Sequence, residues 1–501
     1  KEYRRQRQMC IRDSNNIDTI IGLPSSIFYG TGIPTIIMVL KKQRSHDDVL
    51  FIDASQGFIK DGKNNLLRAR DIERIVDTVH ARRDVEHFAR VVSRDEIRDN
   101  DYNLNIPRYV SATLPPESVD FFATVNGGIP ISEIDDLAEY WNVLPSLRET
   151  LFDEDNNGYA TLRTDDIRET VLGHSAAEAL ADTMNEALDG FAESLKADLI
   201  DNAMAVPVNT AEDAIKADLF ARLAPVPLVN EYQGYQLLHE KWLTIANDLT
   251  ILQTEGWDAM REINPVMEWK TKNKKKVEVQ TGWEGHVATF EIVRDLYLPE
   301  LRDQVDDLTN GRDSVDAELT ALVESLSEED KTDLSDVLNT NETGFRKADL
   351  NKAVKALPAL SKDAQWPEGS IEAIQIEAKQ LLDHLTKVKS QLKKANEELE
   401  TKTHETVENL SDDQVVEVLS TKWVAALMVQ LALLPTLALR GLADQVQHLQ
   451  DKYATPLTEL DTQIATTERS LLTSLDQLTG SDTDMQAVEA LKQMLGGGQR
   501  D

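Results

Sequence analysis

A run of lysines in the stretch KTKNKKK is the strongest concentration of positive charge in this sequence. Ammonium groups at this density can neutralise the phosphates of a nucleic acid. The flanking stretches VMEW and VEVQ also fit the strands of a β-hairpin near residues 266–290, whose solvated tip would carry lysines without any ligand. Both interpretations stand for the candidate DNA-binding residues, which are Lys270, Lys272, Lys274, Lys275 and Lys276.

The stretch DEDNNGYATLRT, residues 153–164, resembles the first half of a calcium-binding loop. The twelfth position of such a loop needs a bidentate glutamate, but here it is Thr164. We therefore expect a polar turn. The positions that fit the calcium-loop offsets are Asp153, Asp155, Asn157 and Gly158.

Cysteine and histidine spacing predicts no metal site. The chain has a single cysteine, Cys10, so it has neither a disulfide framework nor a zinc cluster of cysteines, which is typical of a cytoplasmic protein. His239 and His286 have no companions at ligand spacing, and we expect structural roles for both.

The overall charge limits how the chain can contact nucleic acid. At 501 residues and a formal charge of −35, its long-range field repels phosphates over most of its surface. Any DNA contact must therefore be local or be supplied by a partner. The length predicts two to four structural units.

Two adjacent aromatic residues lie at the tip of a predicted β-hairpin in IGLPSSIFYGTGIPTIIMVLKK, residues 21–42. Phe28 and Tyr29 come directly before Gly30 and Gly32, and these glycines permit a tight turn and the close approach of a ligand. An aromatic residue in this place either closes a hydrophobic core or presents its ring to a ligand.

Short β-branched runs predict strands at 17–23, 33–40 and 48–54, followed by a helix over 69–83. Residues 100–110 are expected to be extended because Pro107 disfavours a helical residue before it. Three apolar strands are too few for a stable sheet covered on both faces. The pattern therefore predicts an incomplete α/β sheet.

Helix dominates from about residue 114 onward, and two apolar series have coiled-coil spacing. One runs from Ile371 to Leu399 and the other from Leu442 to Leu471, with a kink or break expected at Pro456. The two arms can pair antiparallel with each other or receive helices of another protein. The tryptophans expected to anchor cores are Trp242, Trp257, Trp283 and Trp423.

The most apolar stretch, WVAALMVQLALLPTLAL at 423–439, is shorter than the roughly 20 residues that cross a membrane and contains Pro435. It predicts a buried helical hairpin and no membrane partner.

The first 14 residues join poorly to the pattern that follows. The hexapeptide MCIRDS, Met9–Ser14, resembles the translation of a sequencing-library adapter, so residues 1–14 are interpreted as a non-native segment that includes Cys10. The alternative is an ordinary charged N-terminal helix.

Several motifs in order carry a family resemblance. NNIDTIIGLPSSIFYGTGIPTIIMVLKK, VLFIDASQGFIKDGKNNLL and NDYNLNIPRYV resemble the modification subunit of type I restriction–modification systems, a DNA adenine-N6 methyltransferase. The resemblance is strong over residues 15–113. It is looser through EKWLTIANDLTILQTEGWDAMREINP, VEVQTGWEGHVATFEIV, STKWVAAL and KYATPLTELDTQIATTE.

The resemblance implies a mainly α protein with an incomplete α/β part, the C-terminal remnant of a Rossmann-like methyltransferase sheet. Residues 15–113 would be the end of the catalytic domain, 114–350 a helical region with the basic hairpin, and 351–501 a coiled-coil region for subunit assembly. The family's S-adenosylmethionine turn and its Asn-Pro-Pro-aromatic motif are absent from this sequence. We expect both upstream of an N-terminally truncated chain, which would be inactive alone.

By the same resemblance, Phe28 stacks on the adenine that is extruded from the duplex, with Tyr29, Gly30 and Gly32 in the base pocket. The alternative is that Phe28 is a core aromatic. The second signature, with Asn103, Asn105 and Arg108, either approaches DNA or clamps its own segment against the sheet.

The implied partners are DNA, a specificity subunit that reads the sequence, a second modification subunit and a restriction subunit. The long C-terminal helices are expected to pack against helices of the specificity subunit. The competing hypothesis is a non-catalytic helical assembly protein.

Overall fold

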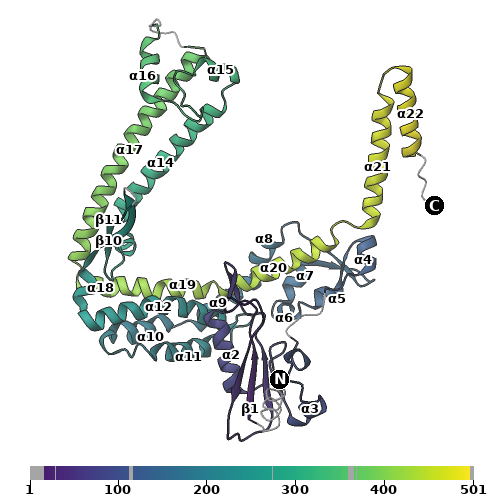
Figure 1. Cartoon of the computed structure of the whole chain (residues 1–501), viewed down its shortest axis with the longest axis vertical. Coiled ribbons are helices and arrows are strands. Elements are labelled where there is room, and N and C mark those ends of the chain that lie inside the picture. Colours follow the sequence, from purple (N-terminus) through teal and green to yellow (C-terminus); the bar gives the residue numbers. More distant parts are fainter. Residues whose placement is uncertain are drawn as a thin grey trace. The chain divides into compact units, whose positions relative to one another are not determined.

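The computed structural model describes residues 16–28, 30–111, 117–272, 275–358, 366–367 and 369–496. The chain divides into two compact units, each assembled from separate stretches of sequence. Unit 1 comprises residues 1–194, 209–243 and 427–501, and unit 2 comprises residues 195–208 and 244–426. Most described residues are helical, and the sheets are small, as the sequence predicted (Figure 1). The predicted segment boundaries at 14, 113 and 350 carry functional assignments that stay predictions.

A four-stranded sheet lies in unit 1, with the strand order β2-β1-β3-β6. β1 pairs in parallel with β3, while β1–β2 and β3–β6 are antiparallel. These strands confirm the three predicted runs and add a fourth. Their bounds are β1 Ile17–Gly22, β2 Ile36–Leu40, β3 Val49–Asp53 and β6 Ala89–Val92.

Both faces of the two central strands are covered. On one face, Ile20 and Phe51 pack with Ile97 of α3 (Arg94–Asp99) and with residues of the following turn. On the other face, Leu50 and Ile52 pack with a cluster that includes α2 (Ala69–Ala81). The expectation that these strands lack covering neighbours is therefore wrong for β1 and β3, because helices and turns later in the chain supply the cover.

The edge strand β2 is different, since four of its five residues are exposed apolar side chains. Exposed apolar edges are unusual in isolated soluble domains. The exposed apolar edge of β2 is the feature that the prediction of an incomplete sheet requires. The exposed residues are Ile36, Ile37, Met38 and Leu40.

A fully buried carboxylate, Asp18, lies within β1. Lys41 Nζ is 2.9 Å from its Oδ2, and the Arg44, Arg82 and His46 side chains lie 3.2–3.4 Å from its Oδ1. Burial raises the pKa of Asp18, but the bond from Lys41 and the charge of Arg82 hold it below its usual range. This network ties β1 to the segment after β2 and to the end of α2.

The remainder of unit 1 is mainly helical around a small sheet of order β7-β9-β8. Its core combines Leu147, Leu151 and Phe152 with the buried face of α20 (Leu434–Tyr453). The other elements are β4 Ile59–Asp61, β5 Asn64–Leu66, α4 Phe121–Asn126, β7 Ile129–Pro130, α5 Ile131–Asp135, α6 Ala138–Trp141, α7 Pro145–Leu151, β8 Phe152–Glu154, β9 Tyr159–Leu162, α8 Ile167–Leu172, α9 Ser175–Ala187, α10 Phe191–Leu195, α11 Ala211–Leu223, α21 Leu457–Asp476 and α22 Asp482–Gly496.

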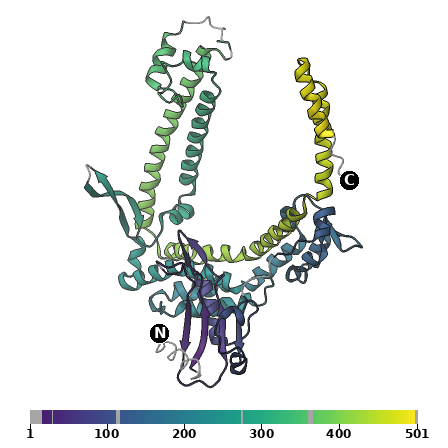
Figure 2. The same cartoon turned by 45° about the vertical axis from the view of Figure 1, so that its right-hand side comes forward.

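Unit 2 contains a long antiparallel helix pair and a projecting β-hairpin (Figure 2). α14 (Pro299–Glu324) packs along α17 (Ile371–Glu408), and β10 (Ile263–Lys272) pairs with β11 (Lys275–Gly285). α12 (Glu231–Glu255) begins in unit 1 and ends in unit 2. The other elements are η2 Lys196–Asp201, η3 Ala203–Ala205, η4 Trp257–Arg261, α13 Phe290–Tyr297, α15 Glu328–Asp333, α16 Lys347–Ala356, α18 Asp412–Leu419 and η5 Ser420–Ala425. The next helix, α19 (Ala426–Ala432), begins with the last residue of unit 2 and continues in unit 1.

The two coiled-coil series do not pair with each other. α14 occupies the α17 seam within unit 2, whereas α20 packs against α8 and α9 within unit 1. Pro456 separates α20 from α21, which confirms the predicted break. The antiparallel pairing of the two series is therefore wrong, because the earlier helix α14, which the heptad pattern did not mark, fills the first seam.

The apolar stretch 423–439 does not form the predicted helical hairpin. It continues from η5 through α19 into α20, because Pro435 lies in the first turn of α20, where its missing N–H costs no hydrogen bond. The helical run Asp412–Tyr453 is long and apolar enough to cross a membrane. An 18-residue window within it has a mean hydropathy of 1.6, and 39% of that window is buried. A core helix of a soluble protein passes the same test, and Trp423, Leu427 and Leu431 are buried in this fold.

Candidate functional site

The carboxyl ends of β1 and β3 meet at one edge of the sheet, because the two strands are parallel and Gly22 lies beside Asp53. The loop that carries Phe28 leaves β1 at this edge. Asn65 of β5 fixes the loop, donating from Nδ2 to the Ser25 carbonyl at 2.7 Å and from its backbone N–H to the Ser26 carbonyl at 3.0 Å. The loop is therefore anchored just before Phe28.

Phe28 is 53% exposed, so its ring does not close the hydrophobic core. Gly30 has a φ of 82°, which favours glycine, and its backbone is open on the side where a Cβ would stand. At Gly32 a Cβ would find only Ser26 Oγ, 3.7 Å away, so space does not demand glycine there. Tyr29 lies outside the described residues.

The segment with Asn103, Asn105 and Arg108 is a compact turn. The prediction of an extended segment is wrong here, because Pro107 begins a short 3-10 helix, η1 (Ile106–Arg108), where its lack of an N–H is tolerated. The Asn103 side chain accepts the Asn105 N–H at 3.0 Å, and Arg108 Nη1 donates to Asn100 Oδ1 at 3.0 Å.

This turn also covers the sheet. Tyr109 stacks on Phe51 with ring centroids 4.4 Å apart and donates its hydroxyl to the Asn103 carbonyl at 2.6 Å. A Cβ at Gly22 would come within 2.8 Å of the Ile106 side chain. These contacts agree with the clamp interpretation of the three polar residues.

The basic run lies at the end of the β10–β11 hairpin, as predicted (Figure 2). Lys270 and Lys276 are exposed, and Lys270 lies 3.7 Å from Glu268. Lys272 and Lys275 pair in the last register of the hairpin, while Lys274 lies outside the described residues. Apolar side chains of the hairpin are also exposed, namely Met267, Trp269, Val277 and Val279.

These apolar side chains are exposed, so this part of the hairpin buries no hydrophobic face. A two-stranded hairpin without a buried hydrophobic face is only marginally stable in water. Exposed apolar side chains next to lysines are the composition of a surface that a partner covers.

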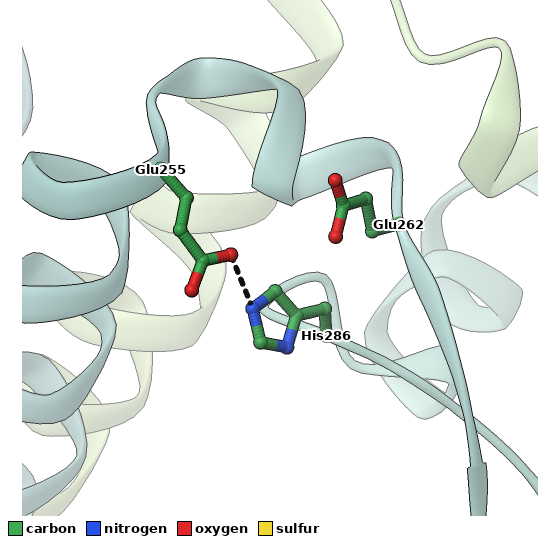
Figure 3. Close-up of side chains that lie close together, drawn as sticks. All are labelled: Glu255, Glu262 and His286. Carbon is green, nitrogen blue, oxygen red and sulfur yellow. Dashed lines mark hydrogen bonds and ion pairs between the residues drawn. The ribbon is translucent and has the colours of Figure 1, made fainter.

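Glu255, Glu262 and His286 form a cluster that residue spacing did not reveal (Figure 3). Their ligand atoms lie within 4.8 Å of one another, and His286 Nε2 lies 2.9 Å from Glu255 Oε2. Asn264 Nδ2 donates to His286 Nδ1 at 2.8 Å, so Nε2 carries the proton that bonds Glu255. The cluster thus pins the end of α12 to the base of the hairpin, the structural role predicted for His286.

Two turns bring this cluster together. Gly256 ends α12 with a φ of 87°, and a Cβ at Gly285 would stand 1.9 Å from the Ala288 carbonyl oxygen. The two glutamates are 24 and 31 residues from the histidine in sequence, so no local spacing could have found them.

The other residues singled out from the sequence have mainly structural roles. His239 bonds Glu212 at 2.7 Å, and Trp423 is buried and donates to Asp248 at 2.9 Å. Trp242 is buried, but Trp283 is 43% exposed on the hairpin, so its prediction as a core anchor is wrong.

The calcium-like stretch is a β-turn between β8 and β9. Asp155 Oδ1 accepts the N–H groups of Asn157 and Tyr159, which confirms a polar turn.

The segment that contains the sheet and its loop is similar to known proteins. Residues 4–117 match the model of the N-6 DNA methylases. The type I restriction enzyme MpnII methylase subunit of Mycoplasma pneumoniae is 40% identical over 123 residues, which are 24% of this chain and 23% of that protein. The MjaVII methylase subunit of Methanocaldococcus jannaschii is 37% identical over 126 residues, 24% of this chain and 22% of that protein.

A solved structure, the methyltransferase subunit of a type I restriction-modification system from Streptococcus thermophilus, is 47% identical. It covers 21% of this chain and 22% of its own, with a TM-score of 0.20. The chain thus spans less than a quarter of the length of these relatives. Over residues 4–117 the chain matches the N-6 DNA methylase family, and the resemblance to type I modification subunits is confirmed for that segment.

Proposed function

We propose that this chain belongs to the modification subunit of a type I restriction–modification system, an enzyme that transfers a methyl group from S-adenosylmethionine to N6 of adenine in DNA, and that the chain alone is inactive. The supporting observation is the half-exposed Phe28 at the carboxyl edge of a sheet that matches the N-6 DNA methylases. A cytoplasmic location is part of this proposal.

Phe28 stacks on the extruded adenine in this proposal. Stacking of a base on an aromatic ring contributes about 1–3 kcal/mol, which offsets much of the cost of taking the base out of the duplex. The bonds from Asn65 hold the loop before the base arrives, so little further ordering is needed.

The described residues do not fit an S-adenosylmethionine site. β1 is followed by Leu23 and Pro24 and not by a glycine-rich turn, and the nearest string to the Asn-Pro-Pro-aromatic motif starts at Asn264 on β10 of unit 2. No step of methyl transfer is therefore assigned to them. Titration calorimetry of this chain should detect no saturable S-adenosylmethionine binding, and clear saturation would show that the cofactor site lies here.

Because the described residues do not fit a cofactor site, the Phe28 role is tested by methylation kinetics of an assembled enzyme that contains this chain, an S-adenosylmethionine site and a specificity subunit. Phe28→Ala should lower the rate by about 5- to 150-fold, the equivalent of a lost stacking contact. Phe28→Tyr keeps the ring and should retain most activity, whereas Phe28→Leu keeps only apolar bulk and should not. Equal rates for all four proteins would reject the stacking role.

The hairpin lysines supply a local phosphate contact in an otherwise acidic chain. Replacing Lys270 and Lys276 by glutamine should reduce the salt slope of DNA binding by about 1.8, since each lost phosphate contact removes about 0.9. The matched control replaces Lys387 and Lys394, two exposed lysines of α17 in the same unit. If both pairs change the slope equally, the hairpin has no special role.

A helical assembly function is favoured by a separate observation, the exposed apolar stripe of α21. Exposed Phe121 and Phe122 of α4, which contacts α21, extend this apolar surface. A specificity subunit is the proposed partner for it, with a second modification subunit and a restriction subunit as further members of the complex. Assembly and methylation are compatible roles of one subunit.

A further inference from the structure

A polar cavity of about 270 Å³ opens beside the end of β3 in unit 1. Its walls come from the end of β3, the first turns of α2 and the start of α12. Three arginines and two aspartates line it, a local excess of positive charge in a chain of net charge −35. The arginines are Arg68, Arg70 and Arg74.

These arginines differ in their partners. Arg68 binds Asp71 through two bonds, Nε to Oδ2 at 2.7 Å and Nη2 to Oδ1 at 3.0 Å. Arg74 lies over the Phe88 ring, with the guanidinium carbon 4.0 Å from the ring centre. Arg70 reaches the same Asp71 only at 3.9 Å, so one carboxylate faces two guanidinium groups.

The charge of Arg70 is therefore less compensated by this carboxylate than the charge of Arg68. Burial, together with the charge of Arg68, lowers the pKa of Arg70, which means that the site disfavours a further positive charge. An anion in the cavity would reverse that penalty, and guanidinium groups bind phosphate oxygens through paired N–H donors.

The cavity wall is fixed by α12. Gln236 Oε1 accepts the Arg70 backbone N–H at 3.1 Å, and the Tyr232 hydroxyl donates to Asp77 Oδ2 at 3.2 Å. Burial and the Asp77 charge raise the pKa of Tyr232 to about 12, so it remains a donor at neutral pH. The arginines are consequently presented by a braced helix and not by a loose loop.

The cavity and the Phe28 loop share one edge of the sheet. Asp53 lines the cavity and lies beside Gly22, the residue where β1 ends before the loop. Asn65 bonds the loop at Ser25 and Ser26, and Arg68 follows Asn65 by three residues. A strand whose base lies against Phe28 would therefore have its backbone near these arginines.

We propose that the pocket of Arg68, Arg70 and Arg74 binds a phosphate group of the DNA strand that presents its base to Phe28. This assignment rests on the proposed function for its DNA source. Phosphate binding as such is inferred from the arginine cavity alone, and a free phosphate compound could bind the same arginines.

The test compares the full chain with Arg70→Gln and with the control Arg98→Gln. Arg98 is an exposed arginine on α3 that pairs with Asp95 at 2.9 Å. Anisotropy of a labelled DNA duplex, measured over a range of salt concentrations, should show the salt slope reduced by about 0.9 in Arg70→Gln and binding weakened about eightfold at 0.1 M salt. Arg98→Gln should behave as the unaltered chain, and both variants should keep its thermal midpoint.

A second arm uses inorganic pyrophosphate and thermal melting. Pyrophosphate should raise the midpoint of the unaltered chain and of Arg98→Gln but not of Arg70→Gln. This loss with an unchanged DNA slope would overturn the DNA source in favour of a free phosphate compound. No difference between Arg70→Gln and the control in either arm would overturn the pocket altogether.

The outcome is independent of the Phe28 test. A normal Arg70→Gln slope combined with slow methylation by Phe28→Ala would reject the pocket and leave the proposed function standing. A reduced slope combined with full methylation by Phe28→Ala would keep the phosphate pocket and reject the stacking role of Phe28.

Discussion

α17 and α21 carry the same sequence pattern but have opposite environments. Both place apolar residues at alternating steps of three and four, the spacing of a coiled-coil seam. In α17 this stripe is buried, including Leu385, Leu392 and Leu399. In α21 the stripe is exposed at Leu457, Leu460, Ile464 and Leu471.

The difference lies in the neighbours and not in the helices themselves. α14 runs along α17 and α16 adds to one end, whereas α21 has α22 beside it and α4 at its beginning. A periodic pattern fixes which face of a helix is apolar, but another segment must supply the surface that covers it. An uncovered stripe of this kind marks a surface for another helix.

The strongest way to separate the two seams is Leu399→Ala in α17. Removing a buried leucine should cost about 2–5 kcal/mol of the free energy of unfolding, because the cavity it leaves adds to the lost burial. Denaturant unfolding measures this loss. The neighbouring Glu400→Ala is exposed and should stay within about 0.5 kcal/mol of the unaltered chain. A loss of similar size in both variants would mean that the α17 seam is not packed.

Substitutions in the α21 seam should change the affinity for a partner and not the stability of the fold. Replacing Ile464 and Leu471 by alanine should weaken the affinity for the specificity subunit by about ten- to a hundredfold, since apolar area is lost from the contact. The same change should leave unfolding of the chain within about 0.5 kcal/mol. Calorimetric titration measures the first effect, with Glu468→Ala as the control. Unchanged affinity would show that this surface is not where the partner binds.

The smallest effect is expected from the ion pairs that border the α17 seam. Hydrogen bonds from Lys379 and Lys347 lower the pKa of Asp383, so its contribution to stability is present above the unfolded pKa of about 3.9. That contribution is lost as the pH falls through the lower folded pKa. Asp383→Asn should therefore unfold at slightly lower denaturant at pH 7, and the difference should vanish in strong acid. A gap that persists in acid would assign the effect to something other than charge.

Local sequence was sufficient for the elements that hold the candidate site. The runs at 17–23, 33–40 and 48–54 became β1, β2 and β3, and the helix predicted over 69–83 became α2. β-branched runs and a 3.6-residue period express the backbone preference of each segment, so they survive in any fold. The break at Pro456 and the polar turn at Asp155 follow from equally local chemistry.

Two predictions that rested on prolines were wrong, and so was one about burial. Residues 423–439 are not a hairpin, because a proline can begin a helical turn as well as end one. The turn at Ile106–Arg108 was missed for the same reason. Trp283 is exposed because its hairpin projects. The composition of the hairpin does not indicate that it projects.

The sequence by itself determined the similarity of residues 4–117 to the N-6 DNA methylases, the strands β1, β2 and β3, the helix α2, and the place of Phe28 after β1. Only the tertiary structure decided that Phe28 is exposed, that α14 covers α17, and that three arginines of one helix start face a cavity at the same sheet edge. The physical reason is range. Backbone preference acts over a few residues, whereas burial and charge pairing depend on segments far apart in the chain.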